Sequence, residues 1–264
     1  MKLDGAGVVV TGGGAGIGAA MARRFAAAGA RVVVNDIDAG AADAVAAELD
    51  GGLSAPGDAA TTEGADALVA AARTHLGEID LFCANAGVGT GGGLDLADEA
   101  GWELAWQVNV MAHVRAARAV MPHWLARGRG NFLATVSAAG LLTMLGAAPY
   151  SVTKHGALAF AEWLSAGYGD RGITVQALCP LGVRTAMLEA AGPTGQAILA
   201  EAAISPQQVA DTVAEALEDG RFLILPHPEV AQMYAGRAAD PDRWLAGMRR
   251  LQKHVDEALA SAED

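Results

Sequence analysis

Positive charge is scarce in this sequence, and long apolar runs are missing. Its 264 residues include 18 Lys and Arg against 30 Asp and Glu, which gives a formal net charge of −12. A nucleic-acid-binding protein needs a basic face, and no Lys/Arg cluster of that size occurs, so we expect no nucleic-acid partner. No uncharged apolar run has the length of a membrane span, so we expect no membrane partner either.

Cysteine is also rare. The two cysteines, Cys83 and Cys179, lie far apart and match neither a metal-binding nor a redox spacing. The six histidines show no metal-ligand spacing, so we predict no metal. Few cysteines favour a reducing compartment, and the first residues contain no signal-peptide apolar segment or cleavage site. The sequence therefore predicts a cytoplasmic protein.

Alternating strand-like and helix-like segments fill the chain, with no repeat or internal boundary. The composition is globular, with 52% hydrophobic and 18% charged residues, and the length fits one sizeable α/β domain or two smaller ones. Alternation of this kind predicts an α/β fold, a parallel sheet covered by helices on both faces. We expect strands over 8–10, 31–36, 53–57, 79–84, 131–136, 173–178 and 222–225, and helices over 17–28, 41–49, 62–76, 99–127, 149–168 and 209–217.

A glycine-rich stretch lies between the first predicted strand and helix. Gly12, Gly14, Gly16 and Gly18 stand where a backbone must turn tightly and can approach a pyrophosphate at a helix N-terminus. The spacing differs from the common dinucleotide fingerprint, and the alternative is a flexible turn. Because the glycines connect a strand to a helix, the nucleotide interpretation is favoured. A second glycine-rich loop is expected over 89–93.

Asp36 ends the second predicted strand, eighteen residues after Gly18. A carboxylate near this distance can accept hydrogen bonds from an adenosine ribose, and it would repel a 2′-phosphate. No Arg or Lys in the glycine loop or just after Asp36 offsets that charge, which favours NAD over NADP. The alternative is that Asp36 caps the helix beginning near Ala39.

Tyr150 and Lys154 are four residues apart in a predicted helix, so they share one face. A tyrosine has an ordinary pKa of about 10, and a nearby ammonium group favours the phenolate and lowers that pKa. Ser137 ends the preceding strand and can bring a hydroxyl to the same point. Together they suit proton transfer at a carbonyl or alcohol oxygen, whereas Tyr150 and Lys154 alone could be ordinary surface residues. His155 faces another direction, and we interpret it as non-catalytic.

Asn109 lies in an apolar helix with Trp102 and Trp106. A buried amide costs free energy unless it is hydrogen-bonded, so Asn109 has either a structural bond or a role in the site. The tryptophans are interpreted as packing or interface residues. An alanine-rich insertion over 185–204 follows the sixth strand and could form a mobile lid.

Several motifs agree in order and spacing with one family. The chain resembles the short-chain dehydrogenases/reductases from Leu3 to about Leu225, through Thr11-Gly12-x-x-x-Gly16-Ile17-Gly18, Asp58, Asn85-Ala86-Gly87, Asn109, Ser137 and Tyr150-x-x-x-Lys154. The resemblance implies a single-domain Rossmann fold with seven parallel strands over 1–264, with a core over 3–225 and a C-terminal extension over 226–264. It also implies a homo-oligomer, with a tetramer favoured over a dimer, built on the helices that carry Trp102/Trp106 and Tyr150/Lys154.

The resemblance implies an NAD-dependent oxidoreductase that interconverts a secondary alcohol and a ketone. Tyr150 would be the general acid/base, Lys154 would lower its pKa and hold the nicotinamide ribose, Ser137 would orient the substrate oxygen, and Asn109 would anchor a water. The implied NAD contacts are Gly12, Gly14, Gly16, Ile17, Gly18, Asp36, Ile37, Asp58, Ala59, Asn85, Ala86, Gly87, Tyr150, Lys154, Pro180, Gly182, Val183 and Thr185.

The chain departs from the family pattern at two places. Where Pro-Gly is usual it has Pro180-Leu181, with Gly182 one position later, and the leucine could narrow the substrate side or shift the backbone. Where an Asp-Gly-Gly turn is common it has Pro226-His227-Pro228-Glu229 and a polar, partly helical tail. The tail could cover a neighbouring subunit, help to close the substrate site, or be a solvated extension.

Apolar residues near the expected site predict a small, largely hydrophobic substrate. They are Leu141, Leu142, Met144, Leu145, Met187, Leu188, Ile198 and Leu199. An alternative function is a dinucleotide-binding regulator or sensor without redox turnover, because a fold does not determine a function. A third is another reaction on the same scaffold, such as dehydration or epimerisation.

Overall fold

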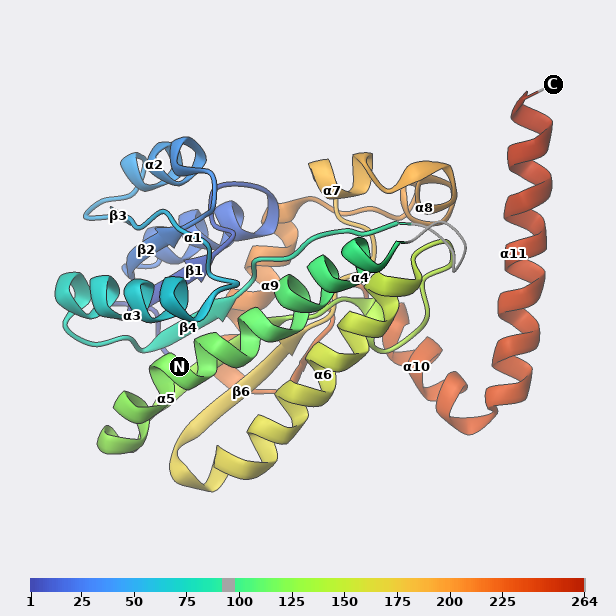
Figure 1. Cartoon of the computed structure of the whole chain (residues 1–264). Helices are drawn as coiled ribbons and strands as arrows, with labels where there is room; N and C mark the ends of the chain where they lie inside the picture. Colours follow the sequence, from blue (N-terminus) through green and yellow to red (C-terminus); the bar gives the residue numbers. More distant parts are fainter. Residues whose placement is uncertain (92–97, 264) are drawn as a thin grey trace.

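The computed structural model describes residues 1–91 and 98–263. Within them, seven strands form one parallel sheet in the order β3-β2-β1-β4-β5-β6-β7 (Figure 1). The predicted doubly wound, seven-stranded α/β fold is therefore confirmed. Residues 92 and 93 of the expected second glycine loop lie outside the described residues. The strands are β1 (Gly7–Thr11), β2 (Arg31–Asn35), β3 (Leu53–Ser54), β4 (Leu81–Ala84), β5 (Gly130–Thr135), β6 (Ile173–Leu178) and β7 (Leu223–Ile224).

The valines of β1 show how the sheet divides two hydrophobic cores. Side chains alternate between the faces of a strand. Val9 packs in one core with Phe82 and Phe132, whereas Val8 and Val10 pack in the other. All three valines are fully buried, which is why this segment is a continuous apolar run instead of an alternating one.

Helices cover both faces of the sheet (Figure 1). The core that contains Val8 and Val10 is closed by α1 (Gly16–Ala27), α2 (Ala39–Ala47) and α9 (Pro206–Asp219). The core that contains Val9 is closed by α3 (Thr62–Leu76), α5 (Ala112–Arg127) and α6 (Ala148–Tyr168). The short 3-10 helices η2 (Ala138–Gly140) and η3 (Gly169–Arg171) lie on either side of α6 in the chain.

The helix predicted over 99–127 is present, but it contains a wider turn. It consists of α4 (Glu99–Trp106), the π-helical segment η1 (Gln107–Met111) and α5, which follow one another without a break. Single π-helical turns inside α-helices occur frequently at functional sites. The π-helical segment contains Asn109, whose position in the site therefore depends on this irregular turn.

The order of the strands creates a crevice at one edge of the sheet. From β1 the chain moves to β2 and β3 on one side, and it then returns to β4 on the other side of β1. In open parallel sheets, ligands bind at this switch point, outside the carboxyl ends of the strands. The segments that follow β1, β4, β5 and β6 all emerge at that edge.

The region predicted as a lid forms two short helices, α7 (Ala186–Glu189) and α8 (Gly192–Leu199). Its ends lie side by side, because the Ile204 N–H donates to the Gly182 carbonyl at 3.1 Å and the Arg184 N–H donates to the Ile204 carbonyl at 2.9 Å. The insertion is therefore a loop closed at its base, with a stem of backbone hydrogen bonds.

The tail beyond the last strand is more helical than expected. It forms α10 (Glu229–Ala239) and α11 (Pro241–Glu263), and α11 stands at the edge of the molecule beside α8 (Figure 1). Val230 is fully buried at the start of α10, and Val255 is buried in α11. None of the helices in the described ranges combines the length and apolar character needed to cross a membrane.

Candidate active site

The glycine loop between β1 and α1 is tightly closed. Gly12 has a φ of +60°, a region that favours glycine. A Cβ on Gly18 would collide with the Gly12 carbonyl, and one on Gly14 would lie 2.9 Å from a carboxylate oxygen of Asp36. The absence of side chains therefore lets the glycine loop, the first turn of α1 and the Asp36 carboxylate pack closely together. This cradle fits a pyrophosphate group.

Asp36 lies beside the glycine loop at the end of β2. Its Oδ2 accepts a hydrogen bond from the Gly14 N–H at 3.0 Å, and its Oδ1 accepts one from the Asp38 N–H at 3.1 Å. The alternative role of Asp36 as the cap of α2 is wrong, because Asp38 is the N-cap and accepts from the Ala41 N–H. Ile37 is largely exposed next to Asp36.

Asn85 joins the carboxyl ends of three neighbouring strands. Its Nδ2 donates to the carbonyls of Thr11 (3.0 Å) and Gly12 (3.2 Å), and its Oδ1 accepts from the Thr135 hydroxyl at 3.0 Å. The Thr11 hydroxyl in turn accepts from the backbone N–H groups of Asn85 and Ala86. Both the nitrogen and the oxygen of the Asn85 amide therefore have hydrogen-bond partners within the protein. Thr11, the first residue of the glycine motif, and Thr135 were not predicted as site residues; the position of each at the end of a strand was the available signal.

Asn109 is fully buried and makes structural bonds. Its Oδ1 accepts from the Val88 N–H at 2.9 Å, and its Nδ2 donates to the Val88 carbonyl (3.0 Å) and the Thr153 hydroxyl (3.2 Å). Of the two roles left open for Asn109, the structural one is observed. A Cβ on Gly87 would lie 3.2 Å from Asn109 Oδ1 and 3.5 Å from Lys154 Nζ, so Asn109 also borders the site.

Lys154 is buried, and its ammonium group is held in place. Its Nζ donates to the Thr135 carbonyl at 3.0 Å and lies 5.6 Å from the centroid of the Tyr150 ring. Burial lowers the pKa of Lys154 to about 8. Thr135 therefore fixes Lys154 through its carbonyl and Asn85 through its hydroxyl.

Tyr150 is half-buried, and its hydroxyl interacts with the Ser137 side chain. Burial raises its pKa above the ordinary value, and the hydrogen bond with Ser137 acts in the opposite direction. The lowering of the Tyr150 pKa that the sequence predicts is not found in the protein alone, because desolvation outweighs the other effects. Ser137 is buried and also accepts from the Ala139 N–H at 3.0 Å, which fixes its side chain.

The segment after β6 forms the opposite wall of the crevice. Val183 pairs with Ile204, and the Thr185 hydroxyl donates to the Val183 carbonyl at 3.2 Å. Thr185 also caps α7, and a Cβ on Gly16 would lie 3.2 Å from its methyl group. The segment over 180–185 therefore faces the glycine loop. The side chain of Leu181 packs partly buried against the hydrophobic core.

The insertion over 185–204 packs onto the loops that follow β4 and β5. A Cβ on Gly89 would lie 3.1 Å from Met187 of α7, and one on Gly146 would lie 3.2 Å from Thr194 of α8. Two of the apolar residues that were predicted to line the site do not reach it, however. Leu141 and Leu142 are buried within the core, so they contribute no surface to the site.

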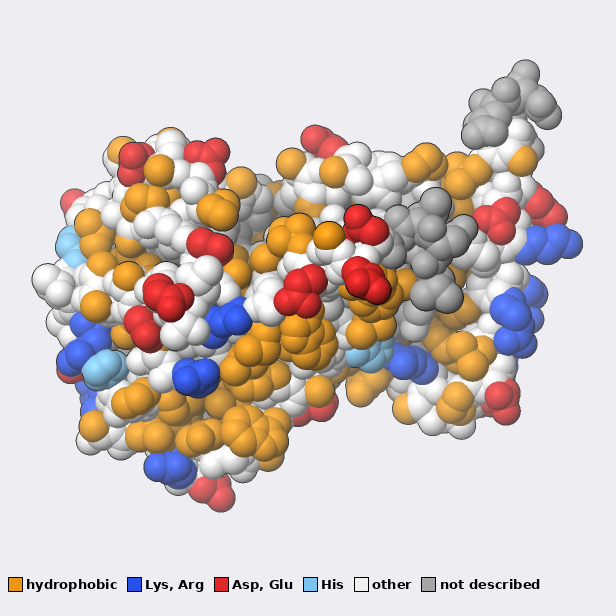
Figure 2. Space-filling model, in the orientation of Figure 1, with side chains coloured by type: hydrophobic (Ala, Val, Ile, Leu, Met, Phe, Trp, Pro, Cys, Tyr) orange, Lys and Arg blue, Asp and Glu red, His pale blue; other side chains and the backbone are white. Residues whose placement is uncertain are grey.

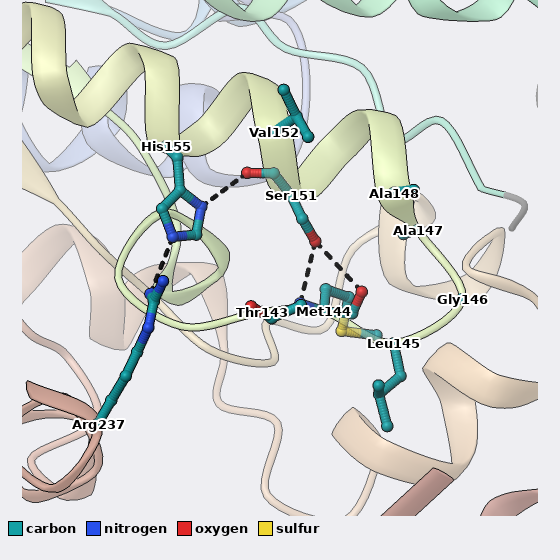
Figure 3. A pocket seen from close by; sticks show the side chains of 10 residues that line it. All are labelled: Thr143, Met144, Leu145, Gly146, Ala147, Ala148, Ser151, Val152, His155 and Arg237. Carbon is teal, nitrogen blue, oxygen red and sulfur yellow. Dashed lines mark hydrogen bonds between the residues drawn. The ribbon is translucent and has the colours of Figure 1, made fainter. Parts of the chain in front are cut away.

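A pocket of about 480 Å³ lies between the segment over 143–147, the first turns of α6 and Arg237 of α10 (Figure 3). The His155 Nδ1–H donates to the Ser151 carbonyl at 2.8 Å, and its Nε2 accepts from Arg237 at 2.9 Å. Arg237 also donates to the Leu141 carbonyl, so α10 is attached to α6. Both nitrogens of His155 are used in these contacts. The lining is Thr143, Met144, Leu145, Gly146, Ala147, Ala148, Ser151, Val152, His155 and Arg237.

Asp58 and Ala59 lie in the loop between β3 and α3. Asp58 is exposed, its Oδ1 accepts from the Ala60 N–H at 2.9 Å, and Ala59 is buried. A second pocket, of about 410 Å³, runs from Asp58 to Leu104 and Arg115. Over residues 1–91 and 98–263, no three His, Cys, Asp or Glu side chains are grouped as they would be around a metal ion.

Comparison with known proteins agrees with this geometry. A family model described as short chain dehydrogenase matches residues 6–195. A 1-deoxy-11-beta-hydroxypentalenate dehydrogenase of Streptomyces exfoliatus is 36% identical over 237 residues, which cover 85% of this chain and 84% of that protein. A meso-2,3-butanediol dehydrogenase of Serratia marcescens is 30% identical over 249 residues, which cover 94% and 92%.

Solved structures show the same fold. A short chain dehydrogenase/reductase from Burkholderia phymatum, in complex with NAD, superposes with a TM-score of 0.84 at 28% identity, covering 92% of this chain and 96% of that one. A 3-ketoacyl-(acyl-carrier-protein) reductase from Brucella melitensis, complexed with NADH, has a TM-score of 0.79 at 27% identity and covers 84% and 96%. The chain therefore belongs to the short-chain dehydrogenase/reductase family, and it is a nicotinamide-dependent oxidoreductase that acts on CH–OH groups.

Proposed function

We propose that this protein interconverts a secondary alcohol and a ketone on a small, largely hydrophobic molecule, with NAD as its cofactor and Tyr150 as the general acid/base. The observation that carries the proposal is the meeting of Ser137, Tyr150 and Lys154 at the carboxyl edge of the sheet, beside the glycine loop. A hydroxyl, a phenol and a buried ammonium group at one point are the groups that proton transfer at an alcohol oxygen needs.

The residues around the crevice fit a dinucleotide. Gly12, Gly14, Gly16, Ile17 and Gly18 would hold the pyrophosphate. Asp36 and Ile37, with Asp58 and Ala59, would hold the adenosine. The nicotinamide end would be held by Asn85, Ala86, Gly87, Tyr150, Lys154, Pro180, Gly182, Val183 and Thr185. When bound, the nicotinamide supplies the hydride donor or acceptor.

The chain itself supplies a proton path. In reduction the Tyr150 hydroxyl gives its proton to the ketone oxygen, and in oxidation the Tyr150 phenolate takes the proton of the alcohol. In both directions Ser137 holds that oxygen by a hydrogen bond. Lys154 contributes a positive charge, which favours the phenolate that forms when Tyr150 gives up its proton. Asn109 would anchor a water beside Lys154, and its position at Gly87 supports this role.

The preference for NAD over NADP rests on Asp36. Its carboxylate lies at the Gly14 N–H, so a phosphate on the adenosine ribose would meet a like charge at this place. No Arg or Lys occurs over 12–18 or over 36–49 to offset that charge.

A hydrophobic substrate is supported by the apolar side chains that remain near the site. Met144 and Leu145 are partly exposed after β5, and Met187 is 42% exposed on the lid. One relative acts on a deoxy-hydroxypentalenate, as its name states. The two cysteines are free, which supports the predicted cytoplasmic location.

A homo-oligomer, with a tetramer favoured, is supported by hydrophobic surface over α4 and α6. Leu104 and Trp106 on α4, and Val152 and Trp163 on α6, are 41–61% exposed, and Figure 2 shows hydrophobic side chains gathered over this part of the molecule. Exposed apolar surface of this kind marks interaction sites. A single domain over 1–264 is part of the same proposal.

The proposal is tested by following NAD⁺ reduction with a panel of hydrophobic secondary alcohols, with NADP⁺ in parallel. We expect turnover with NAD⁺ and little with NADP⁺. Tyr150→Phe should lower kcat by roughly 10²–10⁴-fold, because the proton donor is lost. Tyr168→Phe, the same change near the other end of α6, is the matched control and should leave kcat unchanged.

Nearly full activity of Tyr150→Phe would contradict the role of Tyr150. A preference for NADP⁺ would contradict the argument from Asp36 and leave Tyr150 unaffected. Tight NAD binding without turnover of any alcohol or ketone would favour a regulator or sensor instead.

A further inference from the structure

The two departures from the family pattern contact each other. The backbone N–H of Leu181 donates a hydrogen bond to Nδ1 of His227, at 3.1 Å. Leu181 lies in the segment after β6, and His227 lies in the turn after β7. Because β6 and β7 are paired in the sheet, this bond links the carboxyl ends of two adjacent strands.

The bond determines which nitrogen of His227 carries the proton. A backbone N–H only donates, so Nδ1 is unprotonated and the ring carries its hydrogen on Nε2. His227 is 3% exposed, and its Nε2 has no hydrogen-bond partner among the described residues. An unpaired buried N–H costs free energy, so an apolar ring at this position would avoid that cost. Unlike an apolar ring, however, the histidine offers a hydrogen-bond acceptor to the Leu181 N–H.

His227 is itself held firmly. It lies between Pro226 and Pro228, whose rings restrict the backbone, and its carbonyl accepts from the Val230 N–H at 3.1 Å. Val230 is fully buried against the core. The acceptor nitrogen therefore extends from a rigid turn.

Leu181 is the second residue of the segment over 180–185, which forms one wall of the crevice. The far end of this segment is fixed by Ile204, through the backbone of Gly182 and Arg184. Its near end is held by the bond from Leu181 to His227 and by the Pro180 carbonyl, which accepts from the Ala138 N–H at 2.7 Å. Movement at Leu181 would be passed to Gly182 and Val183, which are proposed to hold the nicotinamide end of the cofactor.

We propose that His227 is a positioning residue for the nicotinamide. Through the Leu181 N–H it holds the segment over 180–185 in the position that accepts the nicotinamide end, and it does not touch the adenosine end. This inference rests on the proposed NAD-binding function. It assigns to the first residues of the C-terminal extension a role in cofactor binding.

The test compares two ligands and two variants. His227→Phe keeps a ring but loses the acceptor, whereas the amide oxygen of His227→Asn can still accept from Leu181. We expect His227→Phe to raise the Kd for NAD roughly three- to tenfold, as for the loss of one hydrogen bond, and to leave the Kd for ADP-ribose unchanged. His227→Asn should restore most of the NAD affinity. Both constants are measured by isothermal titration calorimetry.

The controls separate positioning from general damage. His254→Phe, at an exposed histidine of α11, should change neither constant. Should His227→Phe fail to fold, His227→Gln replaces it, because a glutamine amide reaches the position of Nε2 instead of Nδ1. Unchanged NAD affinity, or an equal loss for NAD and ADP-ribose, would overturn the inference. Absence of NAD binding by the unmodified protein would instead overturn the proposed function.

Discussion

His113 is a buried histidine with no hydrogen-bond partner for either ring nitrogen in the part of the chain that the structure describes. Burial, with a smaller contribution from the charge of Lys154, lowers its pKa to about 3. An unfolded histidine has a pKa of about 6.5. Between these values the unfolded chain binds a proton that the folded protein excludes, so stability falls as the pH is lowered below about 6.5.

We predict that His113→Leu removes this sensitivity. For one proton, the free energy of unfolding changes by at most about 1.4 kcal/mol per pH unit. As the pH is lowered from about 7 to about 5, the variant should therefore lose less stability than the unmodified protein. Urea unfolding at both pH values measures the difference. His254→Leu, at an exposed position, is the control and should follow the unmodified protein. Parallel pH dependence of His113→Leu and the unmodified protein would contradict the prediction.

Single residues differ in how far the sequence could identify them. Tyr150, Lys154 and Ser137 were recognisable because their side chains carry the chemistry and their spacing is fixed by a helix and a strand end. Thr135 was missed because part of its contribution is a backbone carbonyl, which every residue has. Asp36 was a plausible helix cap in the sequence, but Asp38 caps α2 in the structure and Asp36 accepts from the Gly14 N–H of the glycine loop instead.

At the scale of elements, the glycine loop between β1 and α1 determines whether the crevice can form. We predict that Gly18→Ala destabilises the protein by about 1–3 kcal/mol and weakens NAD binding, because the new Cβ would overlap the Gly12 carbonyl. Thermal unfolding and calorimetry measure the two effects.

The matched control is Gly167→Ala in α6, where a Cβ meets nothing within 4 Å. This change should stabilise the helix by roughly 0.5–1 kcal/mol and leave NAD binding unchanged, because alanine favours helices over glycine. Equal behaviour of the two variants would show that the loop tolerates a side chain.

Elements were predicted well where a pattern is long, and less well elsewhere. The extent of the helix over 99–127 follows from its periodicity, but the π-helical turn at 107–111 does not, because one wider turn leaves the apolar pattern almost unchanged. The strand expected over 53–57 is confined to Leu53–Ser54, and the one expected over 222–225 to Leu223–Ile224. Both are the outer strands of the sheet, where one side has no partner strand to extend the pairing.

At the scale of the whole molecule, the surface over α4 and α6 is the proposed contact between copies. We predict that the protein has a mass well above the 26.7 kDa of one chain, and that Trp163→Arg shifts it to a smaller species. The reason is that Trp163 is 61% exposed, and a charge there would be buried without a partner on association. Light scattering after size-exclusion chromatography measures the mass.

Met233→Arg is the control, since Met233 is also an exposed hydrophobic residue but lies on α10. It should leave the mass unchanged. A single-chain mass for the unmodified protein would contradict the proposed assembly, and an unchanged mass for Trp163→Arg would place the contact elsewhere. The sequence suggested this surface through Trp106, which proves to be exposed, whereas Trp102 is half-buried.

The burial of the two cysteine thiols affects how this protein reacts with thiol-modifying reagents. Cys83 lies in β4 and Cys179 directly follows β6; neither is exposed to solvent, and burial raises the pKa of both, that of Cys179 to about 12. Alkylating agents and peroxides react with the thiolate, which is almost absent under these conditions. The folded enzyme should therefore resist inactivation through its cysteines. The rate at which each thiol is modified therefore measures how often the surrounding structure opens. Cys83 reports on opening at the centre of the sheet, and Cys179 reports on opening at its catalytic edge.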